Sequence, residues 1–382
     1  MEELPKLFEG ISMIFEPGGW KFIVMIVIGL VLIALAIVKK YEPLLLLPIG
    51  FGCILCNIPA SAAMGPQGFL TVLYEFGIKN ELFPILLFIG IGAMCDFGPF
   101  FTQPSTLIFG VTAQVGIFIA MGLALLCTRF GIASFTTQEA AAIGIIGAAD
   151  GPSAIMIGQR FAPKYFASIM VAAYSYMSLV PLIQPPVVHA LTTKKERLIR
   201  MTAPGDKQAS KTLRILFPIG VTLVSGLIAP IATPLIGALM FGNLLKECGV
   251  TESLSQTAQK ELSGLITLLL GITIGSTMVA KDFLTLNTML ILGLGLLAFV
   301  FDTAGGVLTA KLINVFLPQG RKINPMVGAC GISAFPMSAR VIQKMAQKED
   351  PSNFILMPAI GANVAGQIGS ILAAGLILSL FG

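Results

Sequence analysis

Residues 144–158 read GIIGAADGPSAIMIG and place one carboxylate, Asp150, inside an apolar stretch of membrane-span length. Burying an ionisable group at such a depth costs from about 2.5 to more than 10 kcal/mol, so these residues usually mark an ion path. The glycines and Pro152 interrupt the helix, which frees backbone carbonyls that could hold a cation. Asp150 is therefore the first candidate for a coupling site. A structural aspartate that caps a half-helix would show the same pattern.

The composition is that of a polytopic membrane protein. Of 382 residues, 55% are hydrophobic and 11% are charged, whereas about a quarter of the residues in soluble domains are charged. The 41 glycines and 23 prolines fit tightly packed and interrupted transmembrane helices. The first apolar run, 22–38, leads directly to Lys39 and Lys40 and is expected to be a retained span. We predict an all-α membrane protein.

Many apolar segments follow one another along the chain, and we expect ten to twelve membrane segments. Several are too short or too rich in glycine and proline to cross as plain helices, which need about 20 residues. Such segments form hairpins or broken helices inside protein or beside a water-filled cavity. The apolar segments lie near residues 22–38, 43–57, 83–95, 105–127, 138–158, 165–190, 212–229, 231–245, 262–279, 287–310, 325–338 and 354–381.

A basic loop at 192–214 divides the chain. It holds seven lysines or arginines against Glu196 and Asp206, so the positive-inside rule places it in the cytoplasm. The tail before the first span carries four glutamates against one lysine and is expected outside. The predicted organisation is an N-terminal tail at 1–20, a first membrane repeat at 21–191, the cytoplasmic linker at 192–214 and a second membrane repeat at 215–382.

The two halves carry similar motifs in the same order. Three pairs lie 180 to 190 residues apart: PIGFGCIL (48–55) with PLIGALMFGNLL (234–245), IGIG (89–92) with ITIG (272–275), and GAADGPS (147–153) with GACGIS (328–333). An outside tail and an inside linker imply an odd number of crossings per half, so the repeats would be inverted. Inverted repeats with broken helices place an ion or substrate site at their interface near the midplane of the membrane.

The broken-helix motifs offer mainly hard oxygen ligands. One negative charge among neutral oxygens suits a monovalent cation such as Na⁺, and it does not suit zinc, which prefers nitrogen and sulfur. We therefore expect Na⁺ and no transition metal. The candidates beside Asp150 are the side chains of Ser153, Asn324, Ser333, Asn363 and Gln367 and the backbone carbonyls of Gly147, Gly328 and Gly331. Asn324 could equally be a helix cap.

Further polar residues lie within apolar runs. A guanidinium binds carboxylates in bidentate fashion, so Arg340 could pair with Asp150 or hold an anionic substrate, or it could snorkel from a helix end. Tyr176 could act as a general acid, or it could be a core tyrosine bonded to the backbone. Asp96 and Asp302 are other intramembrane acids. We rank both below Asp150 and expect each to end a helix or line a cavity.

The longest motifs are similar to one known family, the beta subunit of the sodium-pumping, biotin-dependent decarboxylases. Its members belong to oxaloacetate, methylmalonyl-CoA, glutaconyl-CoA and malonate decarboxylase complexes. The resemblance covers most of the chain from about Pro43 onward. It is carried by GAADGPSAIMIGQRFAPKYFASIMVAAYSYMSLVPLIQPPVVHAL (147–191), FDTAGG (301–306), INPMVGACGISAFPMSARV (323–341) and GANVAGQIGS (361–370).

This resemblance implies a reaction. A cytoplasmic transferase moves a carboxyl group to biotin on a carrier protein, and the beta subunit in the bacterial inner membrane then decarboxylates carboxybiotin. The reaction consumes a proton from outside and drives Na⁺ outward, with a core that moves against a scaffold as in an elevator mechanism. The implied functional residues are all present here: Asp150, Tyr176, Asn324, Gly328, Ser333, Arg340 and Asn363.

The implied roles follow the chemistry of the side chains. Asp150 would carry Na⁺ and, on exchange, a proton. Tyr176 would pass the proton toward carboxybiotin, and Arg340 would anchor the carboxylate or the ureido oxygen of carboxybiotin. The remaining Na⁺ ligands would be Asn324, Gly328, Ser333 and Asn363.

The sequence also indicates the partners. It contains no Met-Lys-Met motif for biotin attachment and no P-loop. We expect a carboxyltransferase alpha subunit, a biotin carrier subunit, a small membrane gamma or delta subunit and further copies of the chain, but no nucleic acid. The alternative is a stand-alone Na⁺-coupled transporter of organic anions, which would use the same ion cluster and Arg340 but would not need a tyrosine at the site.

Overall fold

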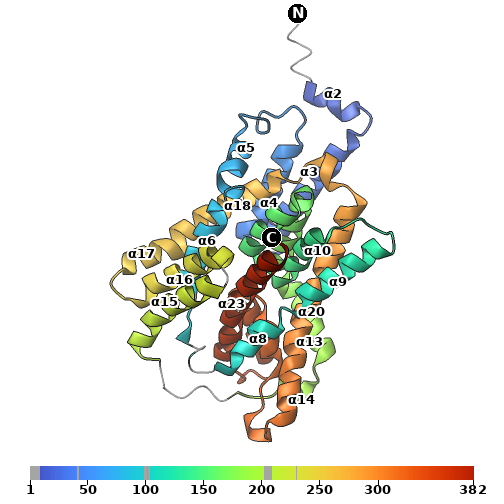
Figure 1. Cartoon of the computed structure of the whole chain (residues 1–382). Helices are drawn as coiled ribbons and strands as arrows, with labels where there is room; N and C mark the ends of the chain where they lie inside the picture. Colours follow the sequence, from blue (N-terminus) through green and yellow to red (C-terminus); the bar gives the residue numbers. More distant parts are fainter. Residues whose placement is uncertain (1–8, 41–42, 99–100, 102–103, 202–208, 229) are drawn as a thin grey trace, which may run out of the picture.

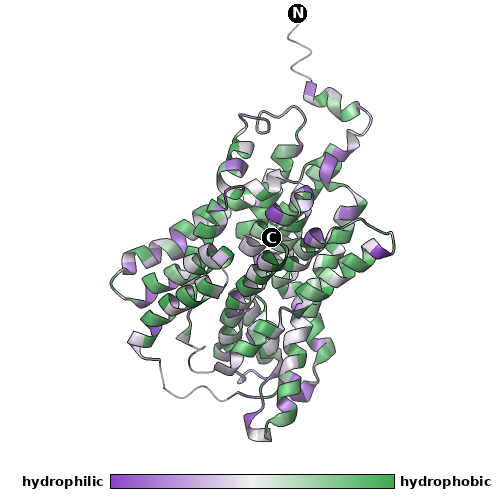
Figure 2. Cartoon of the chain, in the orientation of Figure 1, coloured by the Kyte–Doolittle hydropathy of each residue, from purple (hydrophilic) through white to green (hydrophobic). Residues whose placement is uncertain are grey.

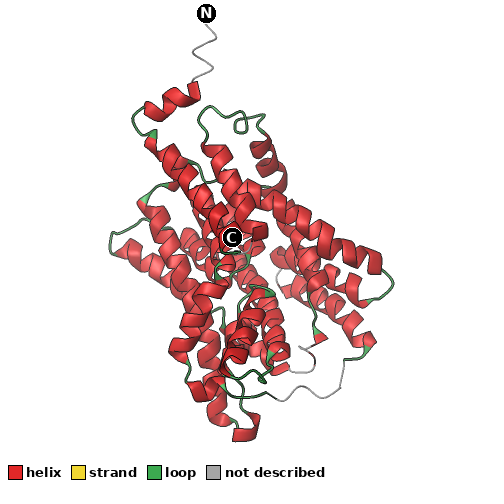
Figure 3. Ribbon diagram, turned by 180° about the vertical axis from the view of Figure 1, so that it is seen from behind, coloured by secondary structure: helices red, strands yellow, loops and turns green. Residues whose placement is uncertain are grey.

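The computed structural model describes residues 9–40, 43–98, 101, 104–201, 209–228 and 230–382, and all regular elements in these ranges are helices (Figures 1 and 3). This confirms the all-α prediction. Helices bond their own backbone groups internally, which a chain surrounded by lipid requires. Residues 1–8 of the predicted tail and 202–208 of the predicted linker lie outside the described residues.

Several helices are long and apolar enough to cross a membrane, so this is a multi-pass membrane protein. Within the described residues, four pass this test by length and composition: Trp20–Val38, Pro104–Arg129, Leu286–Phe316 and Leu356–Phe381. Two bent pairs would raise the number to six: Phe69–Ile78 with Leu82–Met94, and Pro163–Ser178 with Val180–Leu191. Apolar residues cover most helices, as Figure 2 shows. The count of ten to twelve segments, the inverted repeats and the domain limits stay predictions.

One part of the molecule is a row of helices that we call the panel. Neighbours in this row pack along their lengths, and much of the row lies at the left of Figure 1. In spatial order the panel consists of α15 (Lys211–Ile228), α16 (Thr233–Glu247), α6 (Leu82–Met94), α18 (Ser263–Ser276), α4 (Pro43–Asn57) and α3 (Trp20–Val38).

The panel contains two helix crossings with the same reciprocal pattern, one between α4 and α18 and one between α6 and α16. In each crossing, a glycine of either helix lies against a backbone carbonyl of the other, where a Cβ atom would overlap with it. Only glycine permits so close an approach. The pairs are Gly52 with Ile272, Gly275 with Ile49, Gly92 with Leu239 and Gly242 with Ile89.

The second part, which we call the core, holds the broken segments. Within it, α8, α10, α11, α21 and α22 pack against α23, which lies near the centre of Figure 1 and ends at the C-terminus. A capping box between Thr136 and Glu139 starts α10. The core consists of α8 (Leu107–Thr112), α9 (Val115–Arg129), α10 (Thr137–Gly144), α11 (Gly151–Phe161), α12 (Phe166–Ser178), α13 (Val180–Leu191), α20 (Leu286–Phe316), α21 (Pro325–Gly328), α22 (Met337–Glu349) and α23 (Leu356–Phe381).

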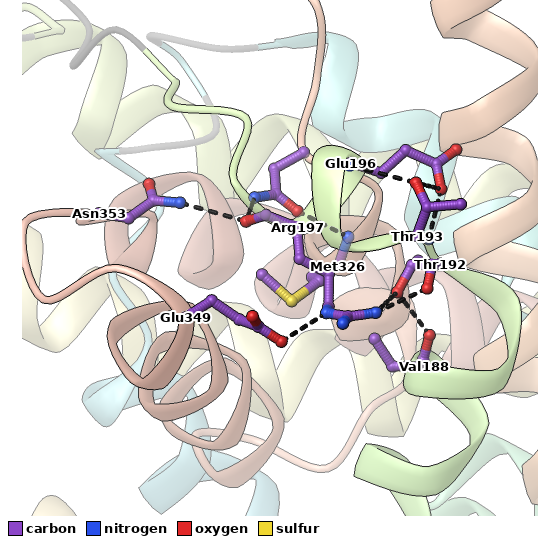
Figure 4. Close-up of polar contacts among 9 residues, drawn as sticks. Val188, Thr192, Thr193, Glu196, Arg197, Met326, Glu349 and Asn353 are labelled. Carbon is purple, nitrogen blue, oxygen red and sulfur yellow. Dashed lines mark hydrogen bonds and ion pairs between the residues drawn. The ribbon is translucent and has the colours of Figure 1, made fainter.

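The linker is tied to the end of α22 by charges (Figure 4). The guanidinium of Arg197 in α14 (Lys194–Arg197) donates to Glu349 over 2.7 Å, and this bond lowers the pKa of Glu349. The Ser352 hydroxyl and the Arg200 guanidinium both donate to Asp350 and lower its pKa to about 2. We call these contacts the linker clamp.

Candidate functional site

The helix that carries Asp150 is broken at the predicted place. A 3-10 turn, η3 (Ile145–Ala148), ends at Ala149, whose backbone is left-handed with a φ of 52°. The next helix, α11, begins at Gly151, and Asp150 lies between the two with an extended backbone. Its side chain is only 4% exposed. The break therefore leaves the carboxylate in the interior of the protein.

Serine hydroxyls surround this carboxylate. Ser153 and Ser370 donate to the same oxygen, Oδ2, over 2.6 and 2.9 Å. The Ser370 Oγ also lies 3.0 Å from the Ser333 Oγ. A hydroxyl can rotate, so it can donate to a carboxylate or turn its lone pairs toward a cation. The group can therefore exist with a proton or with a monovalent cation bound.

The second broken segment meets the first beside Asp150. The 3-10 turn η8 (Ala329–Gly331) ends at Ile332, whose backbone is extended. The next residue, Ser333, donates its N–H to the Ala148 carbonyl over 3.0 Å. This contact joins GAADGPS and GACGIS, the motif pair that suggested a shared site, and it places Ser333 next to Ser370, which donates to the carboxylate.

Three amide side chains hold the second segment in place. Gln114, Asn363 and Gln367 each donate from the amide nitrogen to backbone carbonyls of residues 330–333. Their carbonyl oxygens are buried and have no hydrogen-bond partner within the described part of the chain. An unpaired buried polar atom is costly. Of the three, Gln367 also lines the cavity beside Asp150, so its oxygen is suited to help bind a cation there.

A cavity of about 420 Å³ lies beside Asp150, between the core and the panel. Cavities of this size hold small organic ligands. Both sides contribute polar as well as apolar side chains, and the core supplies the carboxylate. Among the lining residues are Asp150, Gly151, Tyr174, Ser333 and Gln367 from the core and Leu45, Leu87, Ile91 and Ser263 from the panel. Lys260 comes from η6 (Ala258–Leu262), which packs against α6 and α18.

Asn324 is used as a helix cap in this structure. Its Oδ1 accepts from the N–H of Met326 over 3.1 Å at the start of α21. Its amide nitrogen donates to the carbonyls of Arg197 and Ile199 over 2.9 Å each, which ties it to the linker clamp. Asn324 is not among the residues that line the cavity. The sequence left open whether Asn324 is an ion ligand or a helix cap, and in this structure it forms the cap.

Two other predicted residues also lie apart from the carboxylate. Gly328 packs against Gly306, and a side chain on either would overlap with the backbone of the other. Arg340 lies on α22 with an exposed side chain and forms no ion pair with any described residue. The suggested pair with Asp150 is therefore absent from these parts of the structure.

The two tyrosines of α12 take different positions. The Tyr176 hydroxyl donates to the Leu292 carbonyl over 2.6 Å, and this tyrosine does not line the cavity. Tyr174 does line it, and its hydroxyl is buried without a partner among the described residues. The resemblance pointed to Tyr176, and the orientation of α12 gives the two side chains different surroundings.

Sequence reasoning did not find Ser370 and Gln114. Ser370 could have been found, because Asn363, Gln367 and Ser370 follow the i, i+4, i+7 spacing of one helix face. Each of the three side chains forms a hydrogen bond with one of the two broken segments. Gln114 lies between α8 and α9, and no motif in the sequence marks it.

Of the two acids that we ranked lower, Asp96 lies at a helix end, as expected, but the expectation is wrong for Asp302, which lies in the middle of α20. Asp96 follows α6 and accepts from the N–H of Gly98 over 2.8 Å. Asp302 on α20 accepts from the N–H of Gly116, at the start of α9, over 2.5 Å. Its second oxygen is buried without a partner in the described ranges. Neither acid lines the cavity beside Asp150.

Residues 21–381 match the family described as the Na⁺-transporting oxaloacetate decarboxylase beta subunit. The chain belongs to this family. It is 49% identical to the methylmalonyl-CoA decarboxylase subunit beta of Veillonella parvula, over 94% of this chain and 92% of that protein. It is 48% identical to the glutaconyl-CoA decarboxylase subunit beta of Acidaminococcus fermentans, over 96% and 95% of the two chains. It is 43% identical to the oxaloacetate decarboxylase beta chain of Klebsiella pneumoniae, over 99% of each.

Membership of this decarboxylase beta family confirms the resemblance drawn from the motifs. The named relatives are subunits of decarboxylases, so this chain is the beta subunit of a decarboxylase complex and works with other subunits. The relatives act on different substrates while sharing this subunit. The acyl substrate is therefore not determined by the features that they have in common with the chain.

Proposed function

We propose that this beta subunit decarboxylates carboxybiotin and uses the reaction to export Na⁺, with Asp150 as the group that exchanges Na⁺ for a proton. One observation carries the proposal. A buried carboxylate that accepts from two rotatable hydroxyls lies where two broken segments meet and lines a cavity large enough for a small organic group. Intramembrane acids of this kind commonly serve as ion or proton sites.

The proton and the ion compete for the same oxygens. Decarboxylation breaks the bond between the biotin nitrogen and the carboxyl carbon, and that nitrogen then needs a proton. When Asp150 gives up a proton toward the cavity, its carboxylate can accept Na⁺. When Na⁺ leaves, the carboxylate can take a proton from outside. Each decarboxylation would thus reset the site for one exchange.

The Na⁺ ligands in this proposal are side chains that lie where the two broken segments meet. Ser333 and Ser370 supply hydroxyl oxygens, and Asn363 lies on the same face of α23. Na⁺ is the transported substrate here, and biotin is carried by a partner subunit. The roles given to Tyr176, Arg340, Asn324 and Gly328 by the resemblance stay predictions. Arg340 is exposed, so it is free to meet an anion that arrives from outside the chain.

The proposed arrangement in the membrane follows from charge and symmetry. The linker would be cytoplasmic and the N-terminal tail outside, in a bacterial inner membrane, with a carboxyltransferase, a biotin carrier and a small membrane subunit as partners. The two reciprocal glycine crossings support inverted repeats, because α16 and α18 carry the motif partners of α4 and α6. The cavity between panel and core is where relative movement of the two would open and close the site.

The test is the release of CO₂ from free carboxybiotin by the purified chain in liposomes, with its small membrane partner, in the presence and absence of Na⁺. We expect Na⁺ to stimulate release in the native chain and not in Asp150→Asn, which cannot carry a proton and a cation in turn. The matched control is Asp302→Asn, which changes a buried carboxylate away from the cavity. Absence of release at every Na⁺ concentration would contradict the proposal and favour a stand-alone transporter of organic anions.

A further inference from the structure

We infer that Lys260 binds the transferred carboxylate of carboxybiotin in the cavity beside Asp150. The inference rests on the proposed function, since it names a substrate-binding residue of the same site. Neither the sequence motifs nor the resemblance singled out Lys260. The inference comes from the charges that line the cavity and from the helix that carries this lysine.

One acid and one base line the cavity. The acid is Asp150 from the core, and the base is Lys260 from η6, which packs against the panel helices α6 and α18. Among the described residues that line the cavity there is no other lysine, arginine, histidine, aspartate or glutamate. The carboxylate of a ligand is repelled by an ionised Asp150 and attracted by the ammonium of Lys260. A carboxylate bound in this cavity therefore has Lys260 as its cationic partner.

The position of Lys260 on its helix directs it to the cavity. Residues 252–276 are helical throughout, because α17 (Glu252–Thr257), η6 and α18 follow one another without a gap. Residues three or four positions apart are neighbours on a helix surface, and the exposed Leu265 and Leu268 mark another face of this helix. Lys260 lies within the face that lines the cavity, which consists of Gln259, Lys260, Ser263, Gly264 and Thr267.

The turn that carries Lys260 is held firmly against the panel. Residues Ala258–Leu262 form a π-helical turn, and turns of this kind within α-helices are frequent at functional sites. The Ser263 hydroxyl donates to the Ala258 carbonyl over 2.9 Å. The same hydroxyl lies against Gly90 of α6, where a Cβ atom would overlap with it. These contacts fix the backbone from which the lysine side chain extends.

The ammonium of Lys260 is available to a ligand. Lys260 is exposed and forms no ion pair with any described residue. A Cβ atom on Gly264, one turn further along the same face, would meet no atom within 4 Å, so there is open space beside the lysine. Lys246 of the panel differs, because its ammonium donates to the Cys95 carbonyl over 2.9 Å. The role predicted for Arg340 is unaffected, since Arg340 does not line this cavity.

The charge of the substrate decides which kinetic constant Lys260 should affect. The carboxylate of carboxybiotin is charged while it is bound, but it leaves as CO₂, which is uncharged. A cation at this carboxylate therefore stabilises the bound substrate at least as well as the transition state. Interactions of this kind lower KM without raising kcat. Loss of Lys260 should thus raise KM and leave kcat unchanged or higher.

The test uses the full chain with its small membrane partner in liposomes and carboxybiotin methyl ester, in which the transferred carboxylate is the only charge. In Lys260→Met we expect the KM for CO₂ release to rise about tenfold, the lower end for a hydrogen bond to a charged group, because the ammonium is exposed. Lys260→Arg keeps the charge and should stay within about threefold of the native KM. The matched control is Lys281→Met, which removes an exposed lysine of α19 (Ala280–Phe283) that does not line the cavity.

A second measurement separates charge recognition from packing. Biotin methyl ester lacks the transferred carboxylate, so its inhibition constant should be the same in the native chain and in Lys260→Met. An unchanged KM in Lys260→Met, a loss confined to kcat, or an equal rise of KM in Lys281→Met overturns the inference while leaving the proposed function intact. An equal loss of affinity for biotin methyl ester does the same. No release by the native chain overturns both.

Discussion

Asp150 and Asp302 are both buried carboxylates in glycine-rich motifs of the core, with exposures of 4% and 0%. Their surroundings differ because, among the contacts of the described residues, side-chain hydroxyls donate to Asp150 and not to Asp302. Hydroxyls of Ser153 and Ser370 donate to Asp150, whereas a backbone N–H, that of Gly116, donates to Asp302. A backbone N–H can only donate, but a hydroxyl can also offer a lone pair. The donor to Asp302 can thus serve only as a donor, while the hydroxyls around Asp150 can either donate to the carboxylate or help to bind a cation.

Access to the cavity separates the two acids further. Asp150 lines a cavity of about 420 Å³, and Asp302 does not. The second oxygen of Asp302 lies against Gly147, in the same broken segment as Asp150. Burial alone therefore does not identify a functional acid in this protein. A functional acid is identified here by hydroxyl donors and by an open space beside the carboxylate.

The largest difference in activity is expected when each acid is replaced by its amide. Asp150→Asn should abolish Na⁺-driven turnover, a loss of about 10²-fold or more, because an amide carries neither a transferable proton nor a charge. Asp302→Asn should keep turnover within about tenfold, since an amide oxygen still accepts from Gly116. Movement of ²²Na⁺ across proteoliposomes during decarboxylation measures both. Equal loss in the two variants would contradict a structural role for Asp302.

Removing one hydroxyl should weaken the site less than removing the acid. Ser370→Ala deletes the group that joins Asp150 to Ser333. A hydrogen bond to a charged group contributes about 1.5–3 kcal/mol, so the affinity for Na⁺ should fall by about 10- to 100-fold. The control is Ser178→Ala, whose buried hydroxyl donates to the Tyr174 carbonyl of its own helix. If Na⁺ affinity in titrations were unchanged by Ser370→Ala, this hydroxyl would not be a ligand.

Asn324→Ala tests whether a predicted ion ligand is a cap instead. The variant loses the cap of α21 and two bonds to the linker, so we expect the free energy of unfolding to drop by about 1–3 kcal/mol. The affinity for Na⁺ should change less than in Ser370→Ala. Thermal unfolding in detergent, followed by Na⁺ titration, measures the two effects separately. A large loss of Na⁺ affinity with native stability would restore Asn324 as a ligand.

The smallest effect is expected at the linker clamp, which offers a charge-dependent contact outside the membrane. Both Glu349 and Asp350 have lowered pKa values in the folded chain, that of Asp350 being about 2. Groups of this kind stabilise the fold above their ordinary pKa and lose that contribution as the pH falls toward the folded value. Hydrogen exchange of residues 193–200 should therefore show easier local opening as the pH falls below about 4.5.

Glu349→Gln is the control for this measurement, because it removes one of the two titrating carboxylates. Its clamp should open more readily at neutral pH and show a shallower dependence on acid. Opening that is independent of pH in the native chain would show that charge does not hold the linker. Opening that grows with rising pH would contradict the direction of the shifts.

Local sequence was enough to predict the break at Asp150 and the all-α fold. Glycine and proline beside a lone acid interrupt a helix whatever surrounds it, and an apolar chain in lipid has to bond its backbone within each segment. The motif pair GAADGPS and GACGIS also predicted correctly that Ser333 would meet the first broken segment. These conclusions depend on residues close together in the chain or on its overall composition.

Only the tertiary structure decided which groups face the carboxylate. Ser370 reaches Asp150 from 220 residues away, and the orientation of α12 sends Tyr174 to the cavity and Tyr176 to a backbone carbonyl. Apolar helices look alike in sequence, because lipid and protein interior accept the same side chains. Their relative rotation is set by close glycine contacts between distant segments, such as Gly328 against Gly306. Contacts of that kind have no local signature, so the polar partners of the site emerge only when the helices are packed.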